Sequence, residues 1–163
     1  MLKFKIEQLS AEAFKPFGHY YNMDDPQGYS LDGPLHKFYP DRLWDAYAGH
    51  VGFSAIRVRK PEKMIVDTIE YHTTTSEIIL PINGDMILHV APASAGTPVT
   101  HLTKVFLVPK GTMVQMNAGV WHLAPLPAEV DELHALIILP ECTYANDCTV
   151  VPLSEDEQFE IVM

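Results

Sequence analysis

The sequence predicts an all-β fold built as a barrel or sandwich. From Val51 onward, short runs of β-branched and aromatic residues alternate with Pro, Gly and Asn, a pattern typical of strands joined by turns. The expected strands are 53–58, 63–72, 77–82, 85–90, 102–108, 112–117, 120–123, 133–139 and 149–153. The turns at 82–85 and 109–111 contain glycine, which suits a positive φ angle.

The length and composition favour one domain, 1–163. The chain has 163 residues, 47% of them hydrophobic and 20% charged, which is enough to bury a core of its own. Ser10 is placed to cap one helical turn at 10–14, and Pro16 stops it. We expect 1–50 to be an N-terminal cover, with a loop or lid at 18–33 and irregular structure over one barrel end at 35–49. The barrel itself is expected at 51–153, and the tail, 154–163, is expected to begin a capped helix or to fray.

The charge balance narrows the class of partner. A net charge of −10 argues against nucleic acid and anionic membranes, which need a basic footprint, and leaves small molecules or proteins. Residues 1–7 lack the apolar region of a signal peptide and no stretch is long enough to span a membrane, so we expect a cytoplasmic protein. Cys142 and Cys148 lack metal-ligand spacing and are expected to be free thiols.

The segment 70–77 has the composition of a metal or acid/base site. In a strand, Glu70 and His72 project to the same face, and a turn can return Glu77 beside them. Buried charges are costly unless they are paired, bound to a metal or used in chemistry. Without a metal, we expect the two carboxylates to repel so that one becomes protonated. A solvated strand face is the alternative, and the apolar run at 78–82 argues against it.

The same segment resembles the first signature of the cupin family, whose fold is a double-stranded β-helix or jelly-roll barrel. That signature is His-x-His, three or four residues, Glu, six residues and Gly. His72, Glu77 and Gly84 match it, and Glu70 stands where a cupin usually has its first His. The resemblance implies a cupin-type barrel with a more acidic ligand set than is usual in the family.

The second cupin signature is only partly present. It reads Pro-x-Gly, two residues, His, three residues, Asn, and here residues 109–111 are followed by Val114 in place of the His. His122 is the nearest replacement, on a short apolar segment that can enter the same barrel mouth.

The chain as a whole resembles the ureidoglycolate lyases, once called ureidoglycolate hydrolases. Four blocks occur in that family's order over nearly the whole length. They are Leu9-Ser10-Ala11-Glu12-Ala13-Phe14 before Pro16-Phe17-Gly18, Ile69-Glu70-Tyr71-His72 before Ile79-Leu80-Pro81, Gly119-Val120-Trp121-His122, and Asn146-Asp147-Cys148 before Val151-Pro152-Leu153.

Two departures fall where activity is decided. The family usually carries Tyr-His-(Arg/Lys)-x-Val-Trp-His-His-Pro-Leu, whereas residues 116–124 of this chain read Met-Asn-Ala-Gly-Val-Trp-His-Leu-Ala and lack the first and last His of that motif. In addition, Glu77 stands where the family commonly has Gln. Either the substrate differs or the catalytic groups have been redistributed.

The resemblance implies cleavage of ureidoglycolate, or a related small hydroxy or oxo acid, to glyoxylate and urea by acid/base elimination. Its implied catalytic groups are His72, Glu70 and His122. A divalent ion (Ni, Zn, Mn or Fe) is a possible cofactor. The residue types suit a site for it at Glu70, His72, Glu77 and His122.

Candidate substrate contacts are Glu77, Gln115, Asn117 and Trp121. Gln115 and Asn117 equally fit a polar outer face, and Trp121 fits packing. His89 and His134 are expected to be core or face histidines. We also expect a two-fold homodimer. Another metal-dependent cupin enzyme, such as an isomerase or oxygenase, and a non-catalytic ligand-binding cupin remain alternatives.

Overall fold

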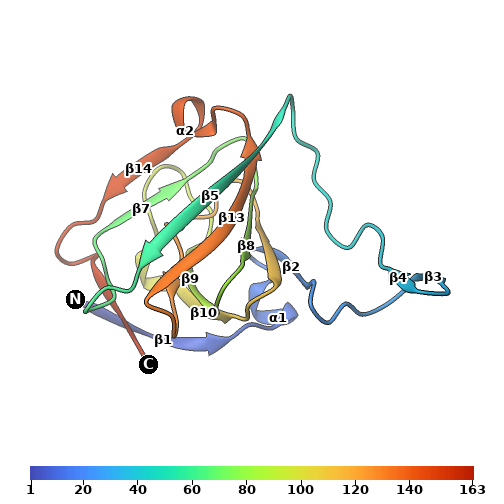
Figure 1. Ribbon diagram of the computed structural model, residues 1–163. Helices are drawn as coiled ribbons and strands as arrows, with labels where there is room; N and C mark the ends of the chain where they lie inside the picture. The colour runs from blue at the N-terminus through green and yellow to red at the C-terminus, as the bar shows by residue number, and fades with distance from the viewer.

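Two curled β-sheets make up most of the computed structural model, which describes residues 1–163 (Figure 1). The six-stranded sheet has the order β12-β9-β10-β1-β15-β6 and the five-stranded sheet the order β2-β11-β8-β13-β5, while β14 pairs with β7 and β3 with β4. The strands are β1 (Leu2–Gln8), β2 (Gly18–Asn22), β3 (Leu31–Gly33), β4 (His36–Phe38), β5 (Val51–Arg59), β6 (Ile65–Val66), β7 (Thr68–Tyr71), β8 (Glu77–Pro81), β9 (Met86–Val90), β10 (Lys104–Val108), β11 (Thr112–Met116), β12 (Leu126–Pro127), β13 (Glu132–Pro140), β14 (Thr149–Pro152) and β15 (Phe159–Val162). The helices are α1 (Ala11–Phe14), α2 (Thr143–Asn146) and the 3₁₀ turn η1 (Thr100–Leu102).

Alternation along β9 divides the interior into two clusters. Met86, Leu88 and Val90 belong to a cluster shared with the five-stranded sheet. Ile87 belongs to a second cluster with Trp121 and the C-terminal strand. Because successive side chains of a strand point to opposite faces, one buried strand serves both clusters.

The two chain ends are strands, which corrects the predicted barrel boundary of 51–153. β1 pairs in parallel with both β10 and β15, so residues of the expected cover and tail lie inside the six-stranded sheet. The tail is neither a helix nor frayed. Phe4 and Ile6 alternate with lysines in β1, and Phe159 and Ile161 alternate in β15, a period-two pattern that fits half-buried strands.

The loop expected at 18–33 begins instead with strand β2, which pairs antiparallel with β11. Its polar sequence suits an edge strand, whose outer face is solvated. The segment 23–49 then leaves the barrel and returns through the hairpin β3–β4, which projects to the side in Figure 1. The hairpin does not cover a barrel end, contrary to the sequence-based expectation.

Several local predictions are confirmed and others are wrong. Ser10 caps α1 by accepting a hydrogen bond from the Ala13 amide at 3.2 Å, and Gly111 has a φ of 75°. Gly84 has no positive φ. The strand expected at 63–72 is broken after Val66, because β6 pairs with β15 whereas β7 pairs with β14. The strand expected at 120–123 forms only two isolated bridges. None of the helices has the length and apolar character needed to cross a membrane.

Candidate active site

Three buried side chains meet at one carboxylate oxygen. Oε2 of Glu77 accepts hydrogen bonds from Nε2 of His72 and Nε2 of His122, each at 3.0 Å. The exposed fractions are 5% for Glu77, 2% for His72 and 3% for His122. The sequence-predicted residues Glu70, His72, Glu77 and His122 are therefore brought to one place.

Strand pairing explains this convergence. Glu77 is the first residue of β8, and His72 directly follows β7. His122 forms an isolated antiparallel bridge with Glu70, whose amide donates to the His122 carbonyl at 2.7 Å. Glu70 and His72 lie on the same face of this strand, as the alternation predicts.

Both imidazoles are held by backbone carbonyls through their other nitrogen. Nδ1 of His72 donates to the Asp147 carbonyl at 2.7 Å, and Nδ1 of His122 donates to the Val120 carbonyl at 2.9 Å. Because carbonyl and carboxylate oxygens only accept, a ring that donates at both nitrogens is an imidazolium. Burial lowers the pKa of both histidines, but the bonds and charge of Glu77 outweigh burial and raise each pKa above its usual value.

Glu77 is ionised in this arrangement. Burial raises its pKa, but the charges and hydrogen bonds of His122 and His72 more than compensate and bring it down to about 2. The expectation that repulsion between carboxylates protonates one of them does not hold for Glu77, because two imidazoles surround it.

The second carboxylate, Glu70, is half-buried and contacts a thiol. Cys148 Sγ donates to Oε2 of Glu70 at 3.3 Å. Burial, followed by the Glu70 carboxylate, raises the pKa of the Cys148 thiol to about 12, so it remains a neutral donor. Tyr144 lies edge-on to the His72 ring with centroids 6.2 Å apart, and burial together with Glu77 and Glu70 raises its hydroxyl pKa.

Glu70, His72 and His122 have the arrangement of a metal-ligand set. Each offers one ligand atom, and these atoms lie within 4.8 Å of one another. The backbone bonds at Nδ1 leave Nε2 of both rings directed at the centre, which is how metal-binding histidines are usually oriented. Two imidazoles and a carboxylate fit Zn, Fe, Mn or Ni. The residues present therefore fit a divalent ion, whose binding at the two Nε2 atoms would replace their hydrogen bonds to Glu77.

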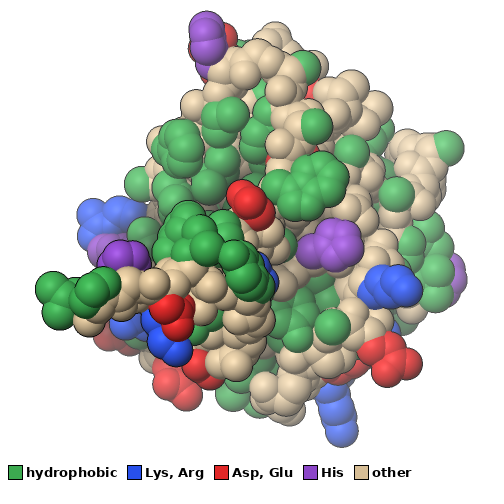
Figure 2. All heavy atoms as spheres, turned by 90° about the vertical axis from the view of Figure 1, so that its right-hand side faces the viewer, with side chains coloured by type: hydrophobic (Ala, Val, Ile, Leu, Met, Phe, Trp, Pro, Cys, Tyr) green, Lys and Arg blue, Asp and Glu red, His purple; other side chains and the backbone are tan.

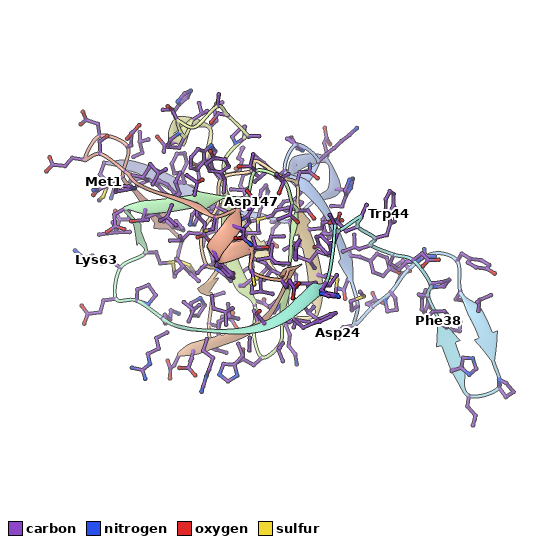
Figure 3. All side chains as sticks on the ribbon, turned by 90° about the horizontal axis from the view of Figure 1, so that it is seen from above. Met1, Asp24, Phe38, Trp44, Lys63 and Asp147 are labelled. Atoms are coloured by element: carbon purple, nitrogen blue, oxygen red, sulfur yellow. The ribbon has the colours of Figure 1, made fainter.

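A loop clamp closes this cluster. The Asp147 carboxylate accepts from the amides of Thr73 and Thr74 at 2.7 and 2.8 Å, and from the Thr74 hydroxyl at 2.6 Å. Burial raises the pKa of Asp147, but these bonds lower it overall. Figure 3, in which Asp147 is labelled, shows this residue over the middle of the barrel. Asp147 therefore fixes both the His72 ring and the loop after it.

Three predicted substrate contacts lie elsewhere. The register of β11 against β8 pairs Met116 with Glu77, so Gln115 faces the opposite side of the sheet. Gln115 Nε2 donates to Asp45 at 2.6 Å. Both residues line an outer cavity of about 530 Å³, and the exposed Asn117 lines it as well. Trp121 is buried in the second core cluster, where its ring lies 4.3 Å from that of Tyr71 and its Nε1 donates to Ser94. Gln115 and Asn117 therefore lie on a polar outer face, and Trp121 serves packing, which are the alternatives that the sequence left open for these residues.

No surface cavity is lined by Glu70, His72, Glu77 or His122. The cavity beside them, of about 310 Å³, is lined by the connecting loop 74–76 and by Asn146 and Asp147 among others. None of its lining residues is Lys or Arg. A ligand that reaches the cluster has to displace part of this covering.

The remaining sequence assignments can now be placed. His89 is buried in a neutral form, because burial lowers its pKa to about 3, and its ring packs against Phe159. His134 bonds Glu132 on the surface at 3.0 Å, and both cysteines are free thiols. The roles of Asp147 and Cys148 were missed, although both stand in a block that resembles the lyase family.

Comparison with known proteins identifies the family and supports the fold. A sequence model described as Ureidoglycolate lyase matches residues 1–161. A ureidoglycolate lyase of Pseudomonas paraeruginosa is 25% identical over 97% of this chain and 95% of its own. One of Rhodobacter capsulatus is 31% identical over 78% of this chain and 82% of its own.

A dTDP sugar isomerase from Desulfovibrio desulfuricans G20 superposes with a TM-score of 0.52 at 8% identity, covering 87% of this chain and 89% of that one. This likeness concerns the fold alone, and with it the predicted cupin-type β-barrel is confirmed. The family blocks seen in the sequence and the match over 1–161 agree, and they support a lyase function. The chain belongs to the ureidoglycolate lyase family.

Proposed function

We propose that the protein cleaves ureidoglycolate to glyoxylate and urea at the Glu70, His72, Glu77 and His122 cluster. The observation that carries the proposal is the convergence of two buried imidazoles on one ionised carboxylate, in a chain of this family. The alternative without catalysis gives no reason for burying these charges together.

The reaction needs proton transfer at two atoms. A base removes the hydroxyl proton at the hemiaminal carbon, the C=O bond of glyoxylate forms as the C–N bond breaks, and an acid protonates the departing urea nitrogen. In the metal-free protein the Nε2–H of His72 or His122 is the acid, because Nδ1 of each ring is engaged by a carbonyl, and the neighbouring Glu70 carboxylate is the base. Glu77 holds both rings in place, and its charge stabilises their protonated form.

Glu70, His72 and His122 are the residues that would hold a divalent ion. When bound, such an ion would supply Lewis-acid polarisation of the substrate hydroxyl and positive charge for its carboxylate. The neighbouring cavity contains no Lys or Arg, so the substrate carboxylate has to meet positive charge deeper in the site. We therefore propose that a metal contributes to substrate binding.

The test is glyoxylate release from ureidoglycolate by the purified protein. It is assayed as prepared, after chelation, and after adding back Ni, Zn, Mn or Fe singly. Replacing His72 by Ala or Glu70 by Gln is expected to lower kcat/KM by at least about 100-fold, the usual contribution of a positioned acid or base. His134→Gln, which alters a surface histidine bonded to Glu132, is the matched control and is expected to keep full activity. Absence of glyoxylate with every ion would discard this reaction.

A further inference from the structure

A cavity of about 310 Å³ adjoins the catalytic cluster, and the proton transfers proposed above give it no role. We call it the mouth cavity. Its walls are the loop 74–76, the segment 45–48 that leads into β5, and residues between 140 and 147 around α2. Sites for small molecules have volumes of about 300–1,000 Å³, so the mouth cavity has room for a small ligand or for one end of it.

The mouth cavity and the catalytic cluster share a wall. Ser76 lines the cavity, and the next residue along β8 is Glu77. Asp147 also lines it, while its carbonyl accepts from Nδ1 of His72 at 2.7 Å. Burial raises the pKa of the Tyr47 hydroxyl on another wall, and the charge of Glu77 acts in the same direction. A ligand anchored in the cluster therefore extends into this cavity once the wall between them moves.

The hydroxyl groups on the cavity walls already donate their protons within the protein. Thr75 Oγ1 donates to the Ser76 carbonyl at 3.0 Å, and Thr143 Oγ1 donates to the Pro140 carbonyl at 2.7 Å. The Ser76 hydroxyl donates to the Asp45 carboxylate. Because a hydroxyl has a single proton and two lone pairs, each of these groups offers the cavity an acceptor.

Carboxylates add further acceptors, and no basic side chain lines the mouth cavity. Asp45, Glu141 and Asp147 belong to the lining, which contains no Lys or Arg. α2 lies at the top in Figure 1, and that end of the face shown in Figure 2 carries no Lys or Arg side chain. The cavity therefore suits a group rich in N–H donors and disfavours a carboxylate.

The carboxylates nearest the cluster are already bonded by the chain itself, so a neutral donor suffices there. Asp147 accepts three hydrogen bonds from the neighbouring loop, and Asp45 accepts one from Gln115 at 2.6 Å. Lone pairs remain on both groups, because a carboxylate has about four acceptor positions. The Asn146 amide also lines the cavity and can donate to a carbonyl oxygen of the ligand.

We infer that the mouth cavity receives the ureido end of the substrate, while the carboxylate end lies toward the catalytic cluster. A ureido group has N–H donors on both nitrogens and a carbonyl acceptor between them, which complements this lining. The inference rests on the function proposed above and adds the orientation of the substrate. It assigns Thr75 and Asn146 as residues that distinguish a ureido acid from another acid of similar size.

Binding of three small acids, measured by isothermal titration calorimetry, tests the assignment. N-carbamoylglycine carries the ureido group but lacks the hydroxyl of ureidoglycolate, so it cannot be cleaved. N-acetylglycine has a methyl group in place of the terminal NH2, and guanidinoacetate has a guanidinium in place of the ureido group. The protein is expected to bind N-carbamoylglycine at least about 10-fold more tightly than N-acetylglycine, because the methyl group leaves cavity acceptors unpaired. It is also expected to prefer N-carbamoylglycine to guanidinoacetate, which has no carbonyl for Asn146.

Substitutions on the cavity wall are expected to remove this preference selectively. Thr75→Val keeps the shape of a buried side chain without its oxygen, and Asn146→Ala removes the amide. Each is expected to reduce the preference for N-carbamoylglycine over N-acetylglycine to about 3-fold or less, with the affinity for N-acetylglycine nearly unchanged. Thr100→Val is the matched control, because Thr100 is 6% exposed against 9% for Thr75 but lies in η1, outside the cavity lining. Circular dichroism checks that each variant keeps its fold.

Equal affinities for N-carbamoylglycine and N-acetylglycine, or no detectable binding of either, overturn the inference. Tighter binding of guanidinoacetate overturns it in favour of a cationic group, and a preference that survives both wall substitutions moves the ureido end out of this cavity. None of these measurements needs turnover. Glyoxylate release without the ureido preference leaves the lyase function standing and removes only the orientation, whereas the preference without glyoxylate release does the reverse.

Discussion

At the scale of single residues, one oxygen atom organises the site. Oε2 of Glu77 receives both Nε2 donors, while the opposite nitrogen of each ring is anchored on the backbone. The pairing keeps charges in the interior that burial alone would neutralise. Replacement of Glu77 therefore affects the two imidazoles more than it affects the strand that carries it.

Glu77→Gln is expected to destabilise the metal-free protein by about 3 kcal/mol, the usual cost of leaving buried charges without their partner. The raised histidine pKa values contribute stability that is complete below the ordinary value of 6.5 and is lost as pH rises through the folded values. The lowered pKa of Glu77 contributes stability that is complete above 4.5 and is lost as pH falls through about 2. The destabilisation caused by Glu77→Gln is therefore expected to be greatest between pH 4.5 and 6.5, where both contributions are complete in the unaltered protein.

Urea denaturation with chelator present measures this loss across pH. Glu160→Gln is the control, because it breaks only the surface pair with Lys3. In parallel, histidine proton resonances followed by NMR are expected to show lower pKa values for His72 and His122 in Glu77→Gln. Unchanged histidine titrations would contradict the role given to Glu77.

At the scale of elements, the segment from α2 to β14 acts as a cover over the site. Asp147 contacts the loop 73–74 through its carboxylate and His72 through its carbonyl, and Cys148 contacts Glu70. Cys142, at the N-terminal end of α2, has a φ of 62°, which is unusual for a residue other than glycine. Because no cavity reaches the cluster, we expect that this segment has to move before a ligand can enter.

Asp147→Ala is expected to lower stability by about 1 kcal/mol, since it removes hydrogen bonds to a charged acceptor that is partly solvated. Hydrogen exchange at the Thr73 and Thr74 amides is expected to accelerate at least tenfold. Asp147→Asn keeps one acceptor oxygen, so its stability and its exchange rates are expected to lie between those of the unaltered protein and those of Asp147→Ala. Mass spectrometry of 70–77 peptides measures the exchange, and equal protection in all three proteins would rule out the clamp.

At the scale of the whole molecule, the two ends of the chain complete the six-stranded sheet. β15 pairs with both β1 and β6, and Phe159 fills the second core cluster next to Phe4 at a ring separation of 5.2 Å. We propose that the chain unfolds as one cooperative domain, because the cores share β9.

Phe159→Ala is expected to cost about 3–5 kcal/mol, the usual loss for truncating a buried aromatic residue. Val150→Ala, at a side chain that is 55% exposed, is expected to change stability by less than about 1 kcal/mol. Thermal unfolding followed by calorimetry is expected to show a single transition in both variants. A separate low-temperature transition in Phe159→Ala would mean that the sheets unfold independently.

The sequence by itself determined the barrel class, most central strands and the pair Glu70 and His72, because period-two alternation reports which side chains share a strand face. It also carried the family resemblance in four ordered blocks. The end strands were missed, since their strength comes from pairing with distant strands and not from local composition.

Only the tertiary structure decided which residues meet. Register places Gln115 and Glu77 on opposite faces of the sheet, and a bridge of two residues brings His122 to Glu70 across about 50 positions of chain. Asp147 acquires its role only when two loops come together. These are long-range contacts, fixed by packing and register, and neither property can be read from one segment of the chain at a time.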